Sequence, residues 1–372
     1  MSDDLPLPSD QLAGAPHPRE THRIYGHHDA EQELLGGFNS GRLHHAWMIT
    51  GPKGIGKATL AWRFARFLLA TPEPETDGLF GAPPPPETLD IPDDHPVARN
   101  MLSGATPGLK QVIRTPNDRG VLRKQIAVED VRALVPFFGL SAAHGGRRIV
   151  IVDAADDMTT QAANALLKTL EEPPARAVLM LITHQPTRLL PTIKSRCRTL
   201  RLSTLGPQDM ARALDQAGVA VPAQAAGHLA ELSGGSVGAA MQLLSQDGLT
   251  IYADLLALLG GLPRLDRGRA AALSRKAAGR EAADRAGLIL DMLDILLARL
   301  ARTGASATPP PEAADGESAV LQRLSPDARA ARHWADKAAE VSARARRALA
   351  ANLDPAAVVL DTVLSIEKTA AA

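Results

Sequence analysis

Short apolar segments alternate with helix-period segments over residues 24–205. The segments 46–50 and 148–153 are short and mostly apolar, which is typical of buried strands, and Leu60 and Phe64 fall on one face of a helix between them. Strands that alternate with helices favour an α/β fold with a parallel sheet. We expect strands at 46–50, 112–114, 148–153, 178–183 and 199–202, and helices at 58–69, 128–138 and 161–171.

The strand pattern ends after residue 205, and only helix-period segments follow. Residues 71–108 are rich in proline, which suits neither helix interiors nor central strands, so we expect an exposed excursion there. The predicted organisation is a flexible leader (1–23), an α/β module (24–205), a small helical unit (206–248) and a helical domain (249–372) with a solvated linker (303–318).

The composition is that of a globular protein without overall charge. The 372 residues are 45% hydrophobic and 22% charged, and this length favours two or three domains. Because 41 Lys and Arg balance 41 Asp and Glu, a nucleic-acid partner would need a local basic face. The sequence offers one cluster, although a solvated face is the favoured interpretation of it: Arg114, Arg119, Arg123 and Lys124.

The sequence lacks two features that would point to other classes of protein, namely paired cysteines and a secretory or membrane-spanning segment. Cys197 is the only cysteine, so an internal disulfide and a cysteine-based zinc site are both excluded. The N-terminus lacks the basic and apolar regions of a secretory signal, and charges interrupt the apolar stretch at 288–300. We therefore expect a cytoplasmic protein.

Residues 51–58 form a phosphate-binding pattern with one residue missing. Gly51, Gly56 and Lys57 complete the pattern G-x-x-x-x-G-K between a predicted strand and a predicted helix. This context points backbone N–H groups at a phosphate, so we predict a P-loop fold. Ala58 replaces the hydroxyl residue that would bind Mg²⁺, and the pattern therefore leaves nucleotide binding open.

Carboxylates follow the strand predicted at 148–153. Asp153 ends this strand, the position of a carboxylate that positions Mg²⁺ in P-loop enzymes. The next residue in ATPases of this kind is commonly a glutamate that activates water, and here it is Ala154. For Asp156 and Asp157 helix capping is the favoured interpretation.

Two further features lie between residues 161 and 202. The predicted helix ends at Glu171 and Glu172, which puts two carboxylates against the helix dipole. Such a locally unfavourable choice often marks a site or an interface. Arg196 precedes the strand predicted at 199–202, where a guanidinium can stabilise charge on a phosphoryl group of a neighbouring subunit. From spacing alone, a surface ion pair is the favoured alternative for Arg196.

Five motifs follow one another along the chain in the order GPKGIGKA, VIVDAAD, NALLKTLEEPP, LITHQPTRLLPTIKSRC and LSGGSVGAAMQLL. This ordered set resembles the clamp-loader subunits of bacterial DNA polymerase III, and most closely their delta-prime branch. The resemblance covers about residues 24–247 and extends weakly into the helical C-terminus. NALLKTLEEPP followed by SRC is much more specific than the phosphate loop.

This resemblance implies an AAA+ protein with an α/β P-loop module, a five-stranded parallel sheet, a helical lid and an all-α C-terminal collar that holds a pentamer together. It implies that Arg196 is the arginine finger of the SRC motif and acts in trans on ATP bound by an adjacent gamma/tau subunit. It also implies a degenerate nucleotide site, with the last residue at the sensor-1 position: Gly51, Gly54, Gly56, Lys57, Asp153 and Thr183.

The chain departs from the active relatives at three points. Ala58 lacks the metal-binding hydroxyl, Ala154 lacks the water-activating carboxylate, and the lid motif at 234–238 lacks a sensor-2 arginine. Each lost contact typically costs a few kcal/mol of transition-state stabilisation, so hydrolysis is not expected even where ATP binds. The four cysteines of the zinc module found in many relatives are also missing, and we expect no zinc or other metal.

The function expected from the resemblance is that of a stator that does not hydrolyse ATP within the DNA polymerase III holoenzyme. The expected partners are gamma/tau and delta clamp-loader subunits, with the sliding clamp and primed DNA contacted through the assembly. One alternative is an active AAA+ motor of the gamma/tau or branch-migration type, which the three departures disfavour. Another is a small-molecule P-loop kinase, which would need neither the SRC segment nor a long helical tail.

Overall fold

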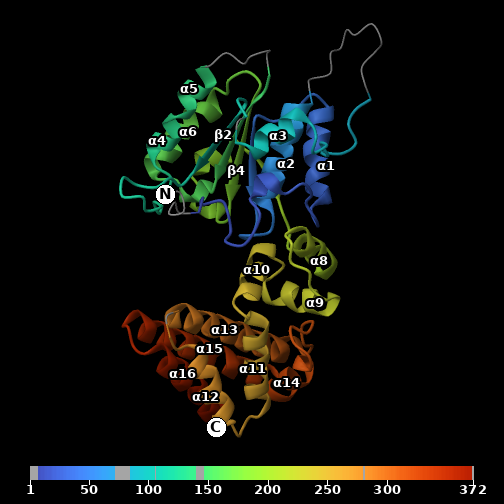
Figure 1. The fold of residues 1–372 in the computed structure, drawn as a ribbon. Coiled ribbons are helices and arrows are strands. Elements are labelled where there is room, and N and C mark those ends of the chain that lie inside the picture. Colours follow the sequence, from blue (N-terminus) through green and yellow to red (C-terminus); the bar gives the residue numbers. More distant parts are fainter. Residues whose placement is uncertain (1–6, 72–83, 105, 140–145, 280, 371–372) are drawn as a thin grey trace. The chain divides into compact units, whose positions relative to one another are not determined.

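The N-terminal part of the chain is built on one parallel sheet (Figure 1). The computed structural model describes the chain except residues 1–6, 72–83, 105, 140–145, 280 and 371–372. Five strands lie in the order β2-β3-β4-β1-β5, and all of their pairings are parallel. The predicted α/β class with a five-stranded parallel sheet is therefore confirmed. The strands are β1 (Ala46–Thr50), β2 (Leu109–Ile113), β3 (Arg148–Asp153), β4 (Ala177–Thr183) and β5 (Arg198–Arg201).

Both faces of this sheet are buried. In β3, Val150 and Val152 belong to one hydrophobic cluster. Ile149 and Ile151 are equally buried, and they face the other way because successive side chains of a strand alternate. A strand buried on both faces is apolar along most of its length, and this is why the central strands β1, β3 and β4 are visible in the sequence as short apolar runs.

Helices cover the two faces of the sheet (Figure 1). The first face carries α4 (Val128–Arg132), α5 (Leu134–Gly139), α6 (Thr160–Glu171) and α7 (Pro191–Lys194), which all contribute to the same cluster. The second carries α1 (His28–Asn39), α2 (Lys57–Ala70) and α3 (Pro96–Leu102). There the rings of Phe38 and Phe67 meet edge to face, with their centroids 4.9 Å apart.

The helix predicted at 128–138 is two helices in the structure. α4 ends at Arg132 and α5 begins at Leu134. The break follows from Pro136, because a proline ring clashes with the carbonyl four residues earlier and lacks the N–H that would bond to it.

The exposed excursion predicted at 71–108 is partly wrong. Residues 72–83 and 105 lie outside the described part of the chain. Further along, α3 forms and contacts α2, and Leu89 and Met101 are buried. Pro96 stands at the start of α3, where its missing N–H costs nothing, so this proline favours a helix instead of preventing one.

Helices alone follow β5 in the described chain. They are α8 (Pro207–Gln216), α9 (Ala223–Leu232), α10 (Val237–Ser245), α11 (Gly248–Gly260), α12 (Arg267–Lys276), α13 (Ala282–Ser306), α14 (Glu317–Leu324), α15 (Ala328–Ala350) and α16 (Pro355–Ala370). None of the helices in the described residues has both the length and the apolar character needed to cross a membrane.

The chain divides into two compact units. The first holds the residues up to 205 together with 212–220 and 236–238, and the second holds the remaining residues from 206 onwards. The expected lid at 206–248 and collar at 249–372 stay predictions.

A buried ion pair lies in the helical unit. Arg299 of α13 donates from Nε to Glu317 Oε1 at 2.7 Å and from Nη2 to Oε2 at 3.0 Å, and Glu317 is 0% exposed. The Tyr252 hydroxyl and the Ala313 N–H donate to the same carboxylate, each at 2.5 Å. These bonds fix the chain ahead of α14. The solvated linker predicted at 303–318 is therefore wrong at Ala313 and Glu317, which are buried.

Arg299→Ala should lower the free energy of unfolding by about 3 kcal/mol, because it leaves the Glu317 carboxylate buried without its counter-ion. Urea unfolding followed by circular dichroism measures this loss. Arg302→Ala, on an exposed position of the same helix, is the control and should change stability by less than about 0.5 kcal/mol. Equal stabilities of the two variants would contradict the importance of the pair.

Candidate functional site

The carboxyl ends of the central strands meet at one edge of the sheet. The register pairs Thr50 with Thr183 and Asp153 with Ile182, so β1, β3 and β4 end at one level. The phosphate loop leaves this edge after Thr50 and enters α2 at Lys57. The structure thus brings together the loop and the two other predicted site residues, Asp153 and Thr183.

The phosphate loop has a backbone that favours glycine. Gly51 and Gly56 have φ angles of 144° and 102°, values that other residues rarely adopt. A Cβ at Gly51 would also lie 2.7 Å from the carbonyl oxygen of Leu202, so conformation and space both require glycine there. Gly56 is the N-cap of α2, and the first N–H groups of this helix are therefore available to an anion.

Lys57 is turned back onto its own loop. The ammonium donates to the carbonyl oxygens of Gly51 at 2.7 Å and Pro52 at 2.5 Å, and the residue is 3% exposed. Desolvation lowers the pKa of Lys57 to about 8, although Asp153 and Asp156 act in the opposite direction. A phosphate that entered the loop would have to compete with these two carbonyls for the ammonium.

Asp153 lies close to Lys57 but is not held by it in an ordinary ion pair. Desolvation, with a contribution from the charge of Asp10, raises the pKa of Asp153 to about 7, and Lys57 only partly offsets this. The neighbouring Ala154 is buried and offers no carboxylate. The edge therefore carries one acid that is half protonated near neutral pH, with no second acid directly after it to activate water.

Asp156 connects two strand ends and does not cap α6. Its Oδ1 accepts the His184 N–H at 3.0 Å, whereas the cap of α6 is Thr159, whose Oγ1 accepts from Ala162 N at 3.2 Å. The capping interpretation of Asp156 and Asp157 is therefore wrong for this helix. Burial lowers the pKa of His184 to about 4, so its ring is neutral at physiological pH.

Thr183 is fully buried at the end of β4. Its hydroxyl oxygen has no hydrogen-bond partner within the described residues, and the residue is 0% exposed. A buried polar group without a partner is costly, and a ligand that bonds to it would remove that cost.

Ser236 and Gly238, from the motif predicted at 234–238, lie against the phosphate loop. The Ser236 hydroxyl donates to Lys53 O at 2.8 Å, and Gly238 N donates to Gly54 O at 2.9 Å. A Cβ on Gly54 would stand 3.0 Å from the Cα of Gly238, so the close approach depends on glycine. The rim of the loop is thus bonded to another segment of the same chain.

Asp10 is a member of this site that sequence reasoning missed. Its side chain is 0% exposed, lies 2.9 Å from His17 Nε2 and accepts a hydrogen bond from Gln111 of β2. Its charge helps to raise the pKa of Asp153. The contact joins residues about one hundred positions apart, and no local pattern in the sequence could have indicated it.

Arg196 lies at the opposite edge of the sheet. It stands two residues before Arg198, which opens β5 and pairs with Trp47 near the start of β1. The phosphate loop follows Thr50 at the other end of β1, and five residues of a strand span about 17 Å. Arg196 is therefore kept apart from the other predicted site residues. Its partner is Glu171, with 2.8 Å between Nη2 and Oε1.

The loop edge suits a phosphate better than a metal ion. The glycine backbone, the end of α2 and the unpartnered Thr183 hydroxyl provide donors for a nucleotide. Ala58 supplies no oxygen for Mg²⁺. Across the described ranges, no three His, Cys, Asp or Glu side chains are grouped so that they could hold a metal ion.

The basic cluster predicted near residue 120 is engaged within the chain. Arg114 Nε lies 3.3 Å from Asp157 Oδ2, and Arg123 Nη1 donates to Thr115 Oγ1 at 3.3 Å. These contacts concern two of the four residues, and the other two, Arg119 and Lys124, are exposed.

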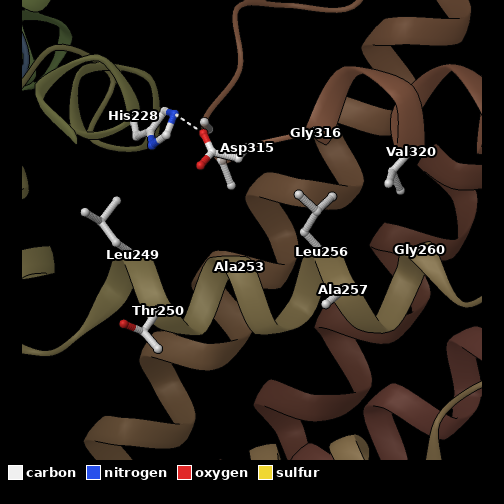
Figure 2. A pocket seen from close by; sticks show the side chains of 12 residues that line it. His228, Leu249, Thr250, Ala253, Leu256, Ala257, Gly260, Asp315, Gly316 and Val320 are labelled. Atoms are coloured by element: carbon white, nitrogen blue, oxygen red, sulfur yellow. Dashed lines mark ion pairs between the residues drawn. The ribbon is translucent and has the colours of Figure 1, made fainter. Parts of the chain in front are cut away.

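The helical unit has a separate pocket of about 520 Å³ (Figure 2). Leu249, Ala253 and Leu256 of α11 line it, and Figure 2 shows His228 and Asp315 facing one another across one end, 3.7 Å apart. These two residues are its only titratable lining groups. The pocket therefore offers an apolar surface and lacks the convergent charges of the phosphate loop.

The free energy of unfolding of the Asp153→Asn variant, relative to that of the parent chain, should rise as the pH increases from about 4 to about 7. The pKa of Asp153 in the folded state, about 7, lies above its ordinary value of 3.8. Between these two values the unfolded chain has released the proton while the folded state still holds it, so the stability of the parent chain falls as the pH rises. Asparagine does not titrate. Urea unfolding at pH 5 and pH 8 measures the difference, with Asp118→Asn on an exposed loop as control. A difference independent of pH would contradict the raised pKa.

Comparison with known proteins connects this geometry to replication proteins. Residues 26–206 match the family model described as DNA polymerase III, delta subunit. The delta-prime subunit of DNA polymerase III from Pseudomonas aeruginosa is 37% identical over 223 residues, which are 60% of this chain and 62% of the relative. A gamma/tau subunit from Mycobacterium bovis is 28% identical over 64% of this chain and 39% of its own length.

Among solved structures, a gamma subunit-related protein of DNA polymerase III from Thermotoga maritima aligns with 91% of this chain and 99% of its own. Its TM-score is 0.38 and its identity 17%. The matched part of the chain spans less than two thirds of the length of the Pseudomonas relative. The family-model match at residues 26–206 contains the whole sheet, the phosphate loop and Arg196.

Proposed function

We propose that this protein is a clamp-loader stator, which supplies Arg196 in trans to the ATP site of a neighbouring subunit. The observation that carries this proposal is the position of Arg196 at the edge of the sheet opposite its own phosphate loop. A residue that is separated from its own loop by the length of β1 cannot serve that loop, but it can face the loop of an adjacent subunit. An arginine supplied in this way stabilises the charge of a transferring phosphoryl group.

The chain's own loop is proposed to be a degenerate nucleotide site that does not hydrolyse ATP. Its lysine is bonded to carbonyl oxygens of the loop, and alanine stands at positions 58 and 154. Hydrolysis needs both a metal ligand and a group that orients water. The loop would then serve as the turn that joins β1 to α2, with room for a phosphate that the chain does not transfer.

The proposed partners follow from the relatives. This chain would join gamma/tau and delta subunits, and it would meet the sliding clamp and primed DNA through the assembly. We further propose that residues 206–248 act as a lid and residues 249–372 as the collar that holds the assembly together. Under this proposal, the work of opening the clamp is driven by ATP in other subunits.

Arg196→Ala should leave the assembly intact and slow ATP hydrolysis in it. Arginine fingers are typically worth a factor of about 10³ or more at the site they serve. Reconstitution with gamma/tau and delta subunits, followed by single-turnover ATPase with clamp and primed DNA, measures the loss. Arg201→Ala is the matched control, because Arg201 is also exposed but ends β5 at the other edge.

Hydrolysis that is equally fast with Arg196→Ala and with the parent chain would defeat the proposal. Gel filtration of each assembly shows whether a slower rate reflects lost assembly. A loss of hydrolysis in both arginine variants would point to general damage.

The isolated chain should not turn over ATP at a measurable rate, because it lacks the metal hydroxyl and the acid that follows Asp153. A phosphate-release assay with Mg²⁺ and ATP measures this. Sustained turnover would instead support the alternative of an active AAA+ motor.

A further inference from the structure

The guanidinium of Arg196 is held through both of its Nη atoms by its own chain. Nη2 lies 2.8 Å from Glu171 Oε1, and Nη1 donates to the carbonyl oxygen of Thr192 at 3.0 Å and to Ser195 Oγ at 3.4 Å. Within the described residues, the Nε–H of Arg196 makes no hydrogen bond. The side chain is therefore anchored on one side, while a donor remains for an incoming group.

We propose that Glu171 is a positioning residue, which orients the Arg196 guanidinium toward the phosphoryl group of ATP bound by a neighbouring subunit. This inference rests on the proposed function of Arg196 and goes beyond it by naming the residue that acts through it. Glu171 ends α6 and Thr192 belongs to α7, so two separate helices fix the guanidinium.

The location of Glu171 is unfavourable for the helix that carries it. A carboxylate in the last turn of a helix opposes the dipole, and α6 has Glu171 at its last position and Glu172 directly after it. Glu171 gains an ion pair with Arg196 in return, whereas the exposed Glu172 side chain makes no hydrogen bond or ion pair within the described chain. The two neighbouring carboxylates thus differ in their partners, and this difference makes Glu172 a natural control.

The pair acts through orientation more than through stability. The side chains of Arg196 and Glu171 are 36% and 48% exposed, and such surface ion pairs contribute little to folding. An arginine side chain has several rotatable bonds, however, and ordering it on binding has a cost in entropy. When Glu171 and Thr192 hold the guanidinium beforehand, that cost is removed from the reaction step.

The effect should appear in the rate of the chemical step. In the reconstituted assembly with gamma/tau and delta subunits, Glu171→Ala should lower kcat by roughly threefold to tenfold, the loss expected when one long side chain is no longer ordered. The KM for ATP should stay unchanged, because the nucleotide is bound by the neighbouring subunit. Glu172→Ala should behave as the parent chain.

Two further variants separate positioning from a structural effect. Glu171→Gln keeps an oxygen that accepts a hydrogen bond from Arg196, so it should restore most of the rate. In the Arg196→Ala background, Glu171→Ala should cause no additional loss, since residues that act through one another are not additive. Gel filtration confirms that each variant enters the assembly.

The outcomes distinguish this inference from the proposed function. If Arg196→Ala slows hydrolysis while Glu171→Ala does not, Glu171 has no positioning role and the finger assignment stands. If Glu171→Ala slows hydrolysis equally with and without Arg196, the effect does not pass through Arg196 and the inference fails. A glutamine variant as slow as the alanine variant would also overturn it. If Arg196→Ala itself has no effect, the proposed function fails first.

Discussion

The parallel register of the central sheet is the constraint on which the rest depends. Because β1, β4 and β5 run in one direction and in fixed register, every strand presents its carboxyl end at one edge and its amino end at the other. The phosphate loop, Asp153 and Thr183 follow carboxyl ends, and Arg196 precedes an amino end. The phosphate loop and the proposed finger, Arg196, thus lie at opposite edges of one sheet. This separation allows a chain to lose one site and keep the other.

The sequence predicts the central strands of the sheet well because burial on both faces leaves little room for polar residues in β1, β3 and β4. The strands predicted at 46–50 and 148–153 have the same bounds in the structure, as β1 and β3. Prediction from the sequence fails where contacts between distant residues determine the structure. Arg299 and Glu317 order a segment whose composition is typical of a linker. Asp10 contacts Gln111, about one hundred residues away, and so joins the candidate site. In the candidate site, motif spacing identifies the loop and Asp153 but cannot show that Lys57 bonds to its own loop.

The loop edge combines parts suited to phosphate with contacts that the chain makes to itself. Lys57 bonds to loop carbonyls, Ser236 and Gly238 bond to the loop rim, and Thr183 keeps an unpartnered hydroxyl. These contacts hold the loop in place without a ligand. Arg196 is bonded as well, but only through its two Nη atoms, so its Nε–H remains for an incoming group. The contrast is consistent with the proposal that the chain's own site is inactive and that Arg196 serves another subunit.

A structure of the reconstituted assembly with a transition-state analogue of ATP hydrolysis tests the central claim most directly. The account predicts that the Arg196 guanidinium lies within hydrogen-bond distance of the γ-phosphate mimic bound by the adjacent gamma/tau subunit. It also predicts that Glu171 remains beside it. An Arg196 that faces away from every bound nucleotide in the assembly would contradict the account.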